Sequence, residues 1–202
     1  MTNNMVHCPN RWTVEFCVFI TSVFLKGYVV DVGAAFGYEI DVSRQLGYPV
    51  IGIECRHSEY ARLKNRYIFD TNVTMIHACA SNKGGLLKLH MGEDSSSIHE
   101  DAMRNVKWKR RRERQPIEYV PALRVDDIRQ TLGIQIGLLK IDVQGYELHV
   151  LKGAIYTLQV DHPMLFFECA SEFNCISGED YMRKLNLTNR YKCICKENCA
   201  CR

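Results

Sequence analysis

Residues 28–54 read YVVDVGAAFGYEIDVSRQLGYPVIGIE and contain the elements that decide the fold. The apolar run at 28–32 predicts a buried strand, and the apolar run at 50–54 predicts a second one. Between them, a glycine-containing turn leads into an amphipathic stretch at 38–46 that predicts a helix. Continuously apolar strands separated by helices are typical of a parallel sheet that is covered on both faces.

The same alternation continues along the rest of the chain and predicts one α/β domain over residues 1–202. Apolar residues make up 47% of the sequence and charged residues 24%, as in folded globular proteins. We expect a Rossmann-like, mostly parallel doubly wound sheet, in which the C-terminal hairpin could be truncated. Further helices are predicted at 58–68, 126–132 and 146–158, and further strands at 73–77, 119–125, 137–141, 164–167 and 191–195, with a hairpin-like pair around 86–91. The stretch from 92 to 116 is polar, basic and irregular.

The apolar segment at 14–25 has the composition of a targeting signal but is too short to span a membrane. It contains Glu15, and Lys26 and Gly27 lead directly into the first strand without a cleavage site of small residues. We interpret it as a helix that faces the core, within an N-terminal helical segment at 1–27. This predicts a cytoplasmic protein with no membrane span, in which the ten cysteines are reduced.

The turn after the first strand and the acid that ends the second strand form the layout of a nucleotide-type cofactor site. Gly33 and Gly37 are separated by three residues, so the turn lacks the G-x-G-x-x-G spacing that brings a helix close to a pyrophosphate. A cofactor without phosphate fits better, and Glu54 stands where an acid binds ribose hydroxyls. Small residues after the third strand leave room for an adenine ring. The expected cofactor contacts are Asp31, Gly33, Ala34, Ala35, Phe36, Gly37, Glu54, Cys55, Cys79 and Ala80.

A more specific motif follows the predicted strand at 137–141. Residues 138–147 read LLKIDVQGYE and residues 150–154 read VLKGA, while DVGAAFGY at 31–38, three serines at 95–97 and VPALRVDD at 120–127 occur in a fixed order with them. This set resembles the FkbM family of methyltransferases over residues 28–170, the cofactor-binding core. The resemblance implies a class I methyltransferase fold, S-adenosylmethionine as cofactor, and methylation of a hydroxyl on a sugar or glycan. Ala35 departs from the family, which commonly has asparagine there.

A hydroxyl is a poor nucleophile until its proton is removed, so the site needs a general base. Asp142 follows the fourth predicted strand of the main sheet and is our candidate, with a helix cap as its alternative role. Glu168 ends the neighbouring strand and could raise the pKa of Asp142, or the two could bind a divalent cation such as magnesium. Ser95, Ser96 and Ser97 are candidate substrate contacts. Lys140 is left out of the site, because we expect its side chain to point away from it.

Two features lie outside this interpretation. The run from Lys107 to Arg114 could attract an acidic substrate, a membrane surface or RNA, but the net charge of +3 does not indicate a nucleic-acid partner. In the C-terminal region at 171–202, with its predicted helix and strand, the cysteine-rich tail could bind zinc through Cys193, Cys195, Cys199 and Cys201. The alternative functions are methylation of another small molecule or of nucleic acid, and a catalytically silent cofactor-binding module. The sequence predicts no particular oligomeric state.

Overall fold

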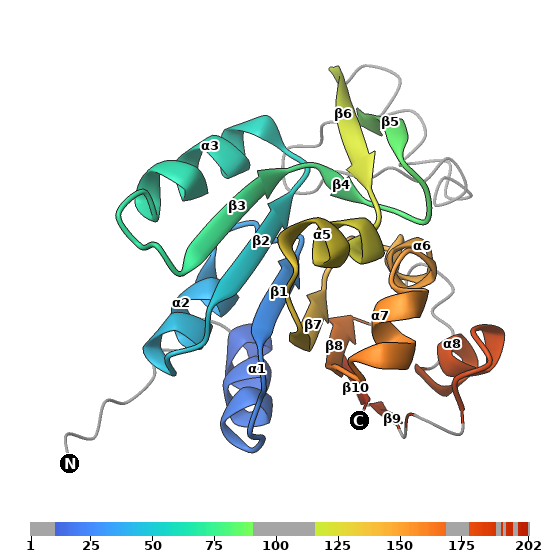
Figure 1. Cartoon of the computed structure of the whole chain (residues 1–202). Helices are drawn as coiled ribbons and strands as arrows, with labels where there is room; N and C mark the ends of the chain where they lie inside the picture. Colours follow the sequence, from blue (N-terminus) through green and yellow to red (C-terminus); the bar gives the residue numbers. More distant parts are fainter. Residues whose placement is uncertain are drawn as a thin grey trace, which may run out of the picture.

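The computed structural model of the chain describes residues 11–90, 116–168, 178–188, 191, 193–195 and 198–201. These residues form a seven-stranded sheet with the order β3-β2-β1-β7-β8-β10-β9 and a smaller three-stranded sheet (Figure 1). The strands of the larger sheet are β1 (Tyr28–Val32), β2 (Val50–Glu54), β3 (Val73–His77), β7 (Ile136–Ile141), β8 (Met164–Glu168), β9 (Cys193–Cys195) and β10 (Asn198–Cys201). The helices are α1 (Arg11–Thr21), α2 (Tyr38–Gln45), α3 (His57–Arg66), α5 (Val125–Leu132), α6 (Glu147–Lys152), α7 (Ile155–Val160) and α8 (Gly178–Lys184).

The five strands β3, β2, β1, β7 and β8 are parallel, and β1 lies at their centre. The chain moves outward from β1 to β3 on one side and then from β7 to β8 on the other, so the direction of winding reverses between β1 and β7. This confirms the predicted doubly wound α/β fold. In such sheets a ligand crevice forms at the carboxyl ends of the strands beside the reversal point.

Successive residues of the central strands point to opposite faces, and each face is packed under its own helices. On one face, Val29 of β1 packs in a cluster with Phe16 of α1 and Ile40 of α2. On the other face, Val30 packs in a cluster with Ile128 of α5 and Leu151 of α6. Both faces of the sheet are therefore buried, which is why the strands read as unbroken apolar runs.

The smaller sheet contains β4 (Cys79–Ala80), β5 (Gly85–His90) and β6 (Ile117–Leu123), in the order β4-β6-β5. β5 pairs with β6 in an antiparallel ladder that ends at His90 and Ile117, so the expectation of a local hairpin around 86–91 was wrong. The partner strand lies more than twenty residues further along the chain, and no local pattern identifies such a pairing. The stretch expected to be irregular, 92–116, lies outside the described residues except for Pro116.

Two other elements differ from their predictions. The single helix expected at 146–158 is two helices, α6 and α7, that meet at Gly153 and Ala154. Gly153 packs so closely on the small-sheet segment that a Cβ there would lie 1.9 Å from the Ser81 carbonyl oxygen. At the C-terminus, β10 pairs antiparallel with β8 and with β9, so the tail contributes two short strands where one was predicted.

The apolar segment near the N-terminus forms α1, which packs Phe16 and Ile20 against the sheet, as expected of a helix that faces the core. Phe16 makes an edge contact with Phe166 of β8 at 5.4 Å between ring centroids. Within the described residues, none of the helices has the length and apolar character needed to cross a membrane.

Candidate functional site

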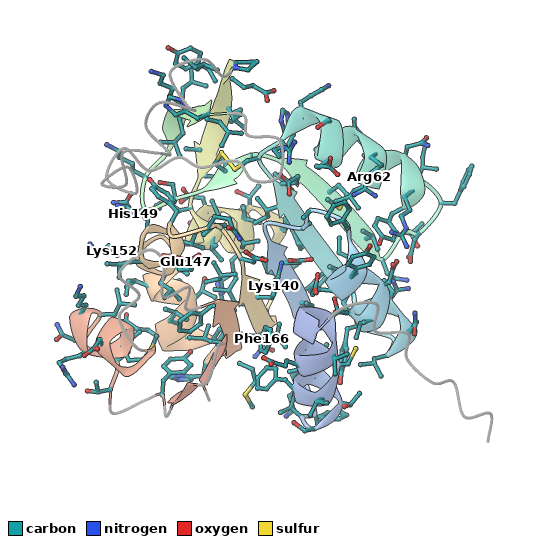
Figure 2. The ribbon with its side chains drawn as sticks, turned by 180° about the vertical axis from the view of Figure 1, so that it is seen from behind. Arg62, Lys140, Glu147, His149, Lys152 and Phe166 are labelled. Carbon is teal, nitrogen blue, oxygen red and sulfur yellow. A yellow bond between two sulfur atoms is a disulfide. The ribbon has the colours of Figure 1, made fainter. Side chains whose placement is uncertain are left out.

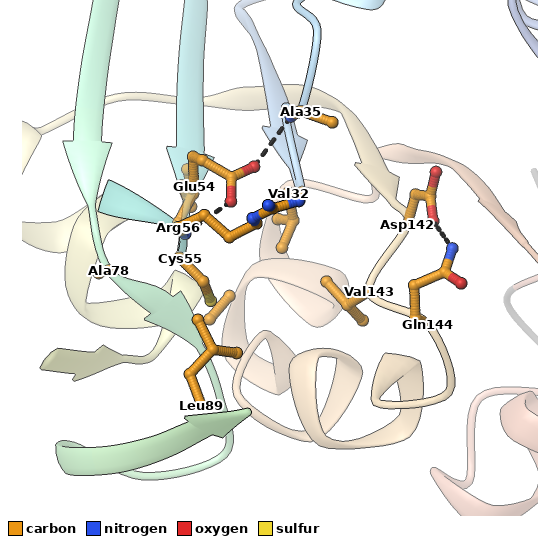
Figure 3. A pocket seen from close by; sticks show the side chains of 13 residues that line it. Val32, Ala35, Glu54, Cys55, Arg56, Ala78, Leu89, Asp142, Val143 and Gln144 are labelled. Carbon is orange, nitrogen blue, oxygen red and sulfur yellow. Dashed lines mark hydrogen bonds between the residues drawn. The ribbon is translucent and has the colours of Figure 1, made fainter. Parts of the chain in front are cut away.

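A pocket opens at the carboxyl ends of β1, β2 and β7, beside the point where the sheet reverses its winding (Figure 3). Its walls come from these strand ends, from the turns that follow them, and from the small sheet. Glu54 and Asp142 lie on opposite sides of the pocket. The lining residues are Val32, Gly33, Ala35, Ile53, Glu54, Cys55, Arg56, Ala78, Ala80, Leu89, Asp142, Val143 and Gln144.

Glu54 is the buried acid at the end of β2, and the backbone fixes its carboxylate from two sides. Oε2 accepts a hydrogen bond from the Ala35 amide at 2.9 Å, and Oε1 accepts one from the Arg56 amide at 2.8 Å. A carboxylate oxygen has two lone pairs, so each oxygen keeps an acceptor position for a ligand hydroxyl. The arrangement suits a pair of ribose hydroxyls.

The turn after β1 needs glycine at Gly33, whose φ of +78° lies in the left-handed region. A Cβ at this position would come within 1.9 Å of the Asp142 carbonyl oxygen, so the turns after β1 and β7 are packed backbone to backbone. Ala35 also has a positive φ of +39°. Its side chain makes this conformation costly, which the contacts around the turn must offset.

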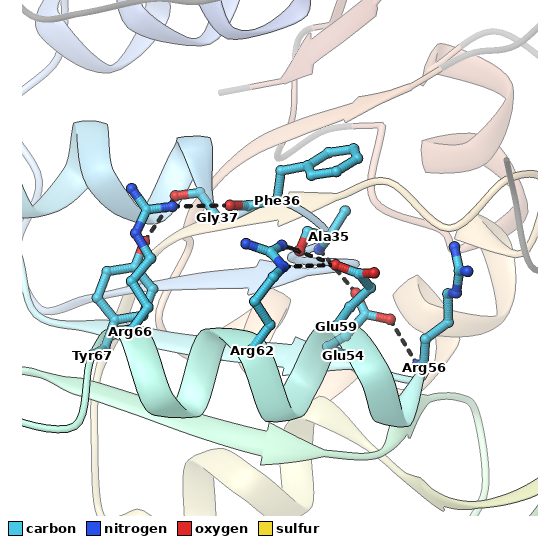
Figure 4. A network of polar contacts seen from close by, with 9 residues as sticks. All are labelled: Ala35, Phe36, Gly37, Glu54, Arg56, Glu59, Arg62, Arg66 and Tyr67. Atoms are coloured by element: carbon cyan, nitrogen blue, oxygen red, sulfur yellow. Dashed lines mark hydrogen bonds and ion pairs between the residues drawn. The ribbon is translucent and has the colours of Figure 1, made fainter.

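Three donors from the α3 segment hold the carbonyl groups of this turn (Figure 4). Arg62 donates to the Ala35 oxygen at 2.7 Å, Arg66 donates to the Phe36 oxygen at 3.2 Å, and the Tyr67 hydroxyl donates to the Gly37 oxygen at 3.0 Å. Arg62 and Arg66 are four residues apart and so lie on the same face of the helix. Helix α3 thereby fixes the wall of the pocket through its side chains.

The charges around the turn favour a cofactor without phosphate. Glu39 and Asp41 stand in the first turn of α2, where a bound phosphate would otherwise be attracted to the helix N-terminus. Glu54 and Asp142 add two carboxylates to the pocket lining, against one cation, Arg56. The Nε of Arg56 is buried and has no hydrogen-bond partner within the described part of the chain, so it can donate to a ligand. These residues fit a cationic cofactor with ribose hydroxyls.

Beneath the turn, Lys140 of β7 places its ammonium group in the interior (Figure 2). Nζ lies 2.9 Å from Oδ1 of Asp31 and donates to the Gly33 carbonyl oxygen at 2.9 Å. Burial would lower the pKa of Lys140, but the nearby carboxylates of Asp31, Glu39 and Asp142 outweigh it and raise the pKa above its ordinary value. Lys140 is not among the residues that line the pocket, but its ammonium group reaches the turn from beneath, a contact that the sequence did not predict.

Asp142 follows β7 and lines the pocket, and its Oδ1 accepts a hydrogen bond from Gln144 Nε2 at 3.0 Å. Gln144 has a φ of +53°, and the turn is held by Glu147, whose Oε1 accepts hydrogen bonds from the Gly145 and Val143 amides. Burial raises the pKa of Glu147, and these bonds offset part of the effect. Helix α6 has Tyr146 at its N-cap, so the alternative of Asp142 as a helix cap finds no support.

The comparison with known proteins adds to this geometry. Residues 31–190 match the family described as the methyltransferase FkbM domain. The chain belongs to the FkbM methyltransferase family. The residues of its signature, 138–147, form β7 and the turn that carries Asp142.

Solved structures with the same fold include an FkbM methyltransferase from Methylobacillus flagellatus KT, with 17% identity and a TM-score of 0.59. The match covers 92% of this FkbM chain and 47% of that one, so the chain spans about half the length of that structure. A protein of the NADB-Rossmann superfamily from Streptococcus agalactiae has 13% identity and a TM-score of 0.52, and the match covers 98% of this chain and 69% of that one. Among curated proteins, none matches the sequence.

The FkbM pocket brings together six of the predicted site residues: Gly33, Ala35, Glu54, Cys55, Ala80 and Asp142. Four others are not among the lining residues: Asp31 and Ala34, which are buried, Phe36, which is 61% exposed, and Gly37, the N-cap of α2. Sequence reasoning missed Arg56 and Gln144, because only the folded turns bring them to the pocket. Ser95, Ser96 and Ser97 and the basic run at 107–114 lie outside the described residues.

Glu168 and Cys79 are the two remaining residues of the predicted site. β7 and β8 are paired with Ile141 opposite Phe167. Asp142 and Glu168 are the next residues on the two strands, so their backbones are neighbours at the carboxyl edge of the sheet. The side chain of Glu168 is not among those that the structure describes. Cys79 is fully buried and does not line the pocket.

Cys79 is joined to Cys55 by a disulfide, with 4.7 Å between the two Cα atoms. The expectation that every cysteine is reduced was therefore wrong for this pair. It rested on an assumed cytoplasmic compartment, and the sequence separation of 24 residues gave no sign that the ends of β2 and β3 bring the two thiols together. The cytoplasmic location stays a prediction.

Proposed function

We propose that this chain is an S-adenosylmethionine-dependent O-methyltransferase that acts on a hydroxyl group of a sugar or glycan. The observation that carries the proposal is the pocket at the reversal point of an FkbM domain, with Glu54 on one side and Asp142 on the other. The acids at the start of α2 support a cofactor without phosphate, and the FkbM family supports methyl transfer.

Glu54, Arg56 and the turn at 33–37 would hold the cofactor. The Glu54 oxygens keep free acceptor positions for ribose hydroxyls, and the Arg56 Nε is available to an acceptor on the ligand. When bound, S-adenosylmethionine supplies a methyl group on a sulfonium centre. The carboxylates of Glu54 and Asp142 give the lining the charge that such a cation requires.

Asp142 is the proposed general base. Gln144 occupies its Oδ1 and limits the rotation of the carboxylate, so that Oδ2 can take the proton of an acceptor hydroxyl. The acceptor oxygen must also lie in line with the methyl group, and the rigid turns after β1 and β7 provide the fixed frame for this. Glu168 and the three serines stay predicted contributors. A magnesium ion is not part of the proposal: it would need Glu168 beside Asp142, and the Glu168 side chain lies outside the described residues.

The cofactor is tested by calorimetric titration with S-adenosylmethionine beside NADH. We expect the wild type to bind S-adenosylmethionine alone, and Glu54→Gln to weaken binding by about 10-fold or more, since hydrogen bonds to a charged group contribute about 1.5–3 kcal/mol. Asp180→Asn, an exposed carboxylate on α8, is the control and should bind like the wild type. Binding of NADH alone, or equal affinity in Glu54→Gln, would contradict the assignment.

The reaction is tested by transfer of a labelled methyl group to sugar and glycan hydroxyls beside matched amines. We expect methylation of the hydroxyl acceptors, and a loss of about 100-fold or more in rate for Asp142→Asn with cofactor affinity retained. An equally active Asp142→Asn variant would remove Asp142 from the mechanism. Transfer to amines alone would exclude the O-methyltransferase.

A further inference from the structure

Three potential metal ligands from three different elements converge outside the pocket. They are His57, the first residue of α3, His77, the last residue of β3, and Glu118, the second residue of β6. One ligand atom of each lies within 4.8 Å of those of the other two. The two imidazole rings meet edge to face, with their centroids 5.2 Å apart.

We propose that His57, His77 and Glu118 form a binding site for a divalent transition-metal ion of the zinc class. Two imidazole nitrogens and one carboxylate oxygen are ligands that zinc accepts, and three protein ligands leave a fourth position for water. Magnesium and calcium prefer oxygen ligands throughout and do not match this set. This inference goes beyond the proposed function and does not depend on it.

Two contacts restrict the His77 ring. Its Nε2 lies 3.1 Å from the Cys55 carbonyl oxygen, and a donated hydrogen bond there leaves Nδ1 with its lone pair for a metal. Histidine ligands commonly have their second nitrogen fixed by a carbonyl group in this way. Tyr60 stacks on the His77 ring at 4.9 Å between centroids and restricts its rotation.

The ligand atoms must approach one another by about 1 Å to bind one zinc ion. Ligand atoms around a tetrahedral zinc ion are about 3.4 Å apart, given metal–nitrogen bonds of about 2.0–2.1 Å. His57 is exposed and Glu118 is half-buried, so both side chains have room to rotate toward His77.

The three ligands come from elements of both sheets. α3 and β3 belong to the main sheet and its cover, whereas β6 belongs to the smaller sheet. A metal held by all three would link the two sheets. Because His77 contacts the Cys55 carbonyl oxygen, the metal would also hold Cys55 in place, and Cys55 is one of the residues that line the pocket.

The test measures zinc binding by the full chain after dialysis against a chelator, with a chromophoric chelator as competitor. Zinc binding by the tail cysteines is also a prediction, so every measurement is repeated with Cys193, Cys195, Cys199 and Cys201 replaced by serine. We expect one zinc ion to remain bound in that background, and His57→Ala or Glu118→Gln to weaken it by more than about 100-fold. His162→Ala, an exposed histidine between α7 and β8, is the control and should bind normally.

Cobalt substitution gives a second readout. Nitrogen and oxygen ligation should produce visible bands without the strong near-ultraviolet absorption of cobalt–thiolate bonds. Three results would overturn the proposal: no zinc binding by the wild type, loss of binding with the four tail cysteines, or unchanged affinity in His57→Ala and Glu118→Gln. Because His57 is exposed and Gln has the shape of Glu, we expect both variants to fold, and circular dichroism checks this directly.

Discussion

At the scale of single residues, the buried Lys140 shows how one side chain supports the cofactor turn. Its ammonium group is 2.9 Å from Asp31 and also holds the Gly33 carbonyl group. The Glu39 carboxyl group, whose pKa burial raises, lies near enough to favour the charged lysine. Removing one partner of a buried ion pair leaves the other charge without compensation, which is more costly than removing both.

We therefore expect Lys140→Met to lower the free energy of unfolding by about 3–5 kcal/mol, measured by urea titration. The double variant Lys140→Met with Asp31→Asn should recover part of this loss, because it removes the uncompensated carboxylate. Equal losses in the single and double variants would mean that the ion pair is not the cause.

At the scale of elements, α3 acts on the pocket through the donors that it directs at the turn after β1. Arg62 holds the Ala35 carbonyl group, and the same turn contains a left-handed alanine and the amide that binds Glu54. Loss of this contact should loosen the turn, while leaving the core untouched, because the Arg62 side chain is 43% exposed.

Arg62→Ala should weaken binding of S-adenosylmethionine by about fivefold, the equivalent of one hydrogen bond of about 1 kcal/mol, with a smaller effect on stability. Arg183→Ala is a matched control, because Arg183 also pairs with an acid three residues earlier but lies on α8. Titration calorimetry on both variants measures their affinity for S-adenosylmethionine. Equal affinities would show that α3 does not position the turn.

At the scale of the whole molecule, the Asp161 carboxylate links the end of α7 to α5 and to the start of β7, at the end of the sheet opposite the pocket. It accepts hydrogen bonds from Arg129 of α5 at 2.7 and 2.6 Å and from the Ile136 amide of β7 at 2.9 Å. Partial burial opposes ionisation, but these bonds outweigh it and hold the pKa of Asp161 below its ordinary value.

A carboxylate with a lowered pKa in the folded state stabilises the fold above its unfolded pKa of about 3.9, and this contribution is lost as the pH falls through the folded pKa. Asp161→Asn should therefore unfold more easily than the wild type at pH 7, by about 1.5–3 kcal/mol, and the difference should shrink below about pH 4. Urea unfolding across this range measures both effects. If the difference in free energy of unfolding stays constant with pH, the lowered pKa of Asp161 is not its cause. Asp180→Asn is the control and should have nearly the same free energy of unfolding as the wild type at pH 7 and below pH 4.

Much of this molecule could be predicted from the sequence where the signal is local. The strands at 28–32, 50–54 and 73–77 have the predicted bounds, because they are short apolar runs bordered by turns. Glu54 and Asp142 were placed at strand ends by the same patterns, and the structure brings both to one pocket.

The predictions failed where the contact partner lies far along the chain. The pairing of β5 with β6, the break at Gly153 and the disulfide between Cys55 and Cys79 each depend on a second segment that the local sequence does not identify. The contact of Lys140 with the Gly33 carbonyl group likewise depends on the pairing of β7 with β1.

The ladder of β5 and β6 has a consequence for how such enzymes diversify. Because His90 and Ile117 are paired, the two ends of the intervening 26 residues start side by side, so that the insert can change in length or composition while its anchor points stay the same distance apart. The strands that carry Leu89 to the pocket wall would not be disturbed. An engineer who exchanges residues 91–116 would therefore keep the anchor points at His90 and Ile117 in place.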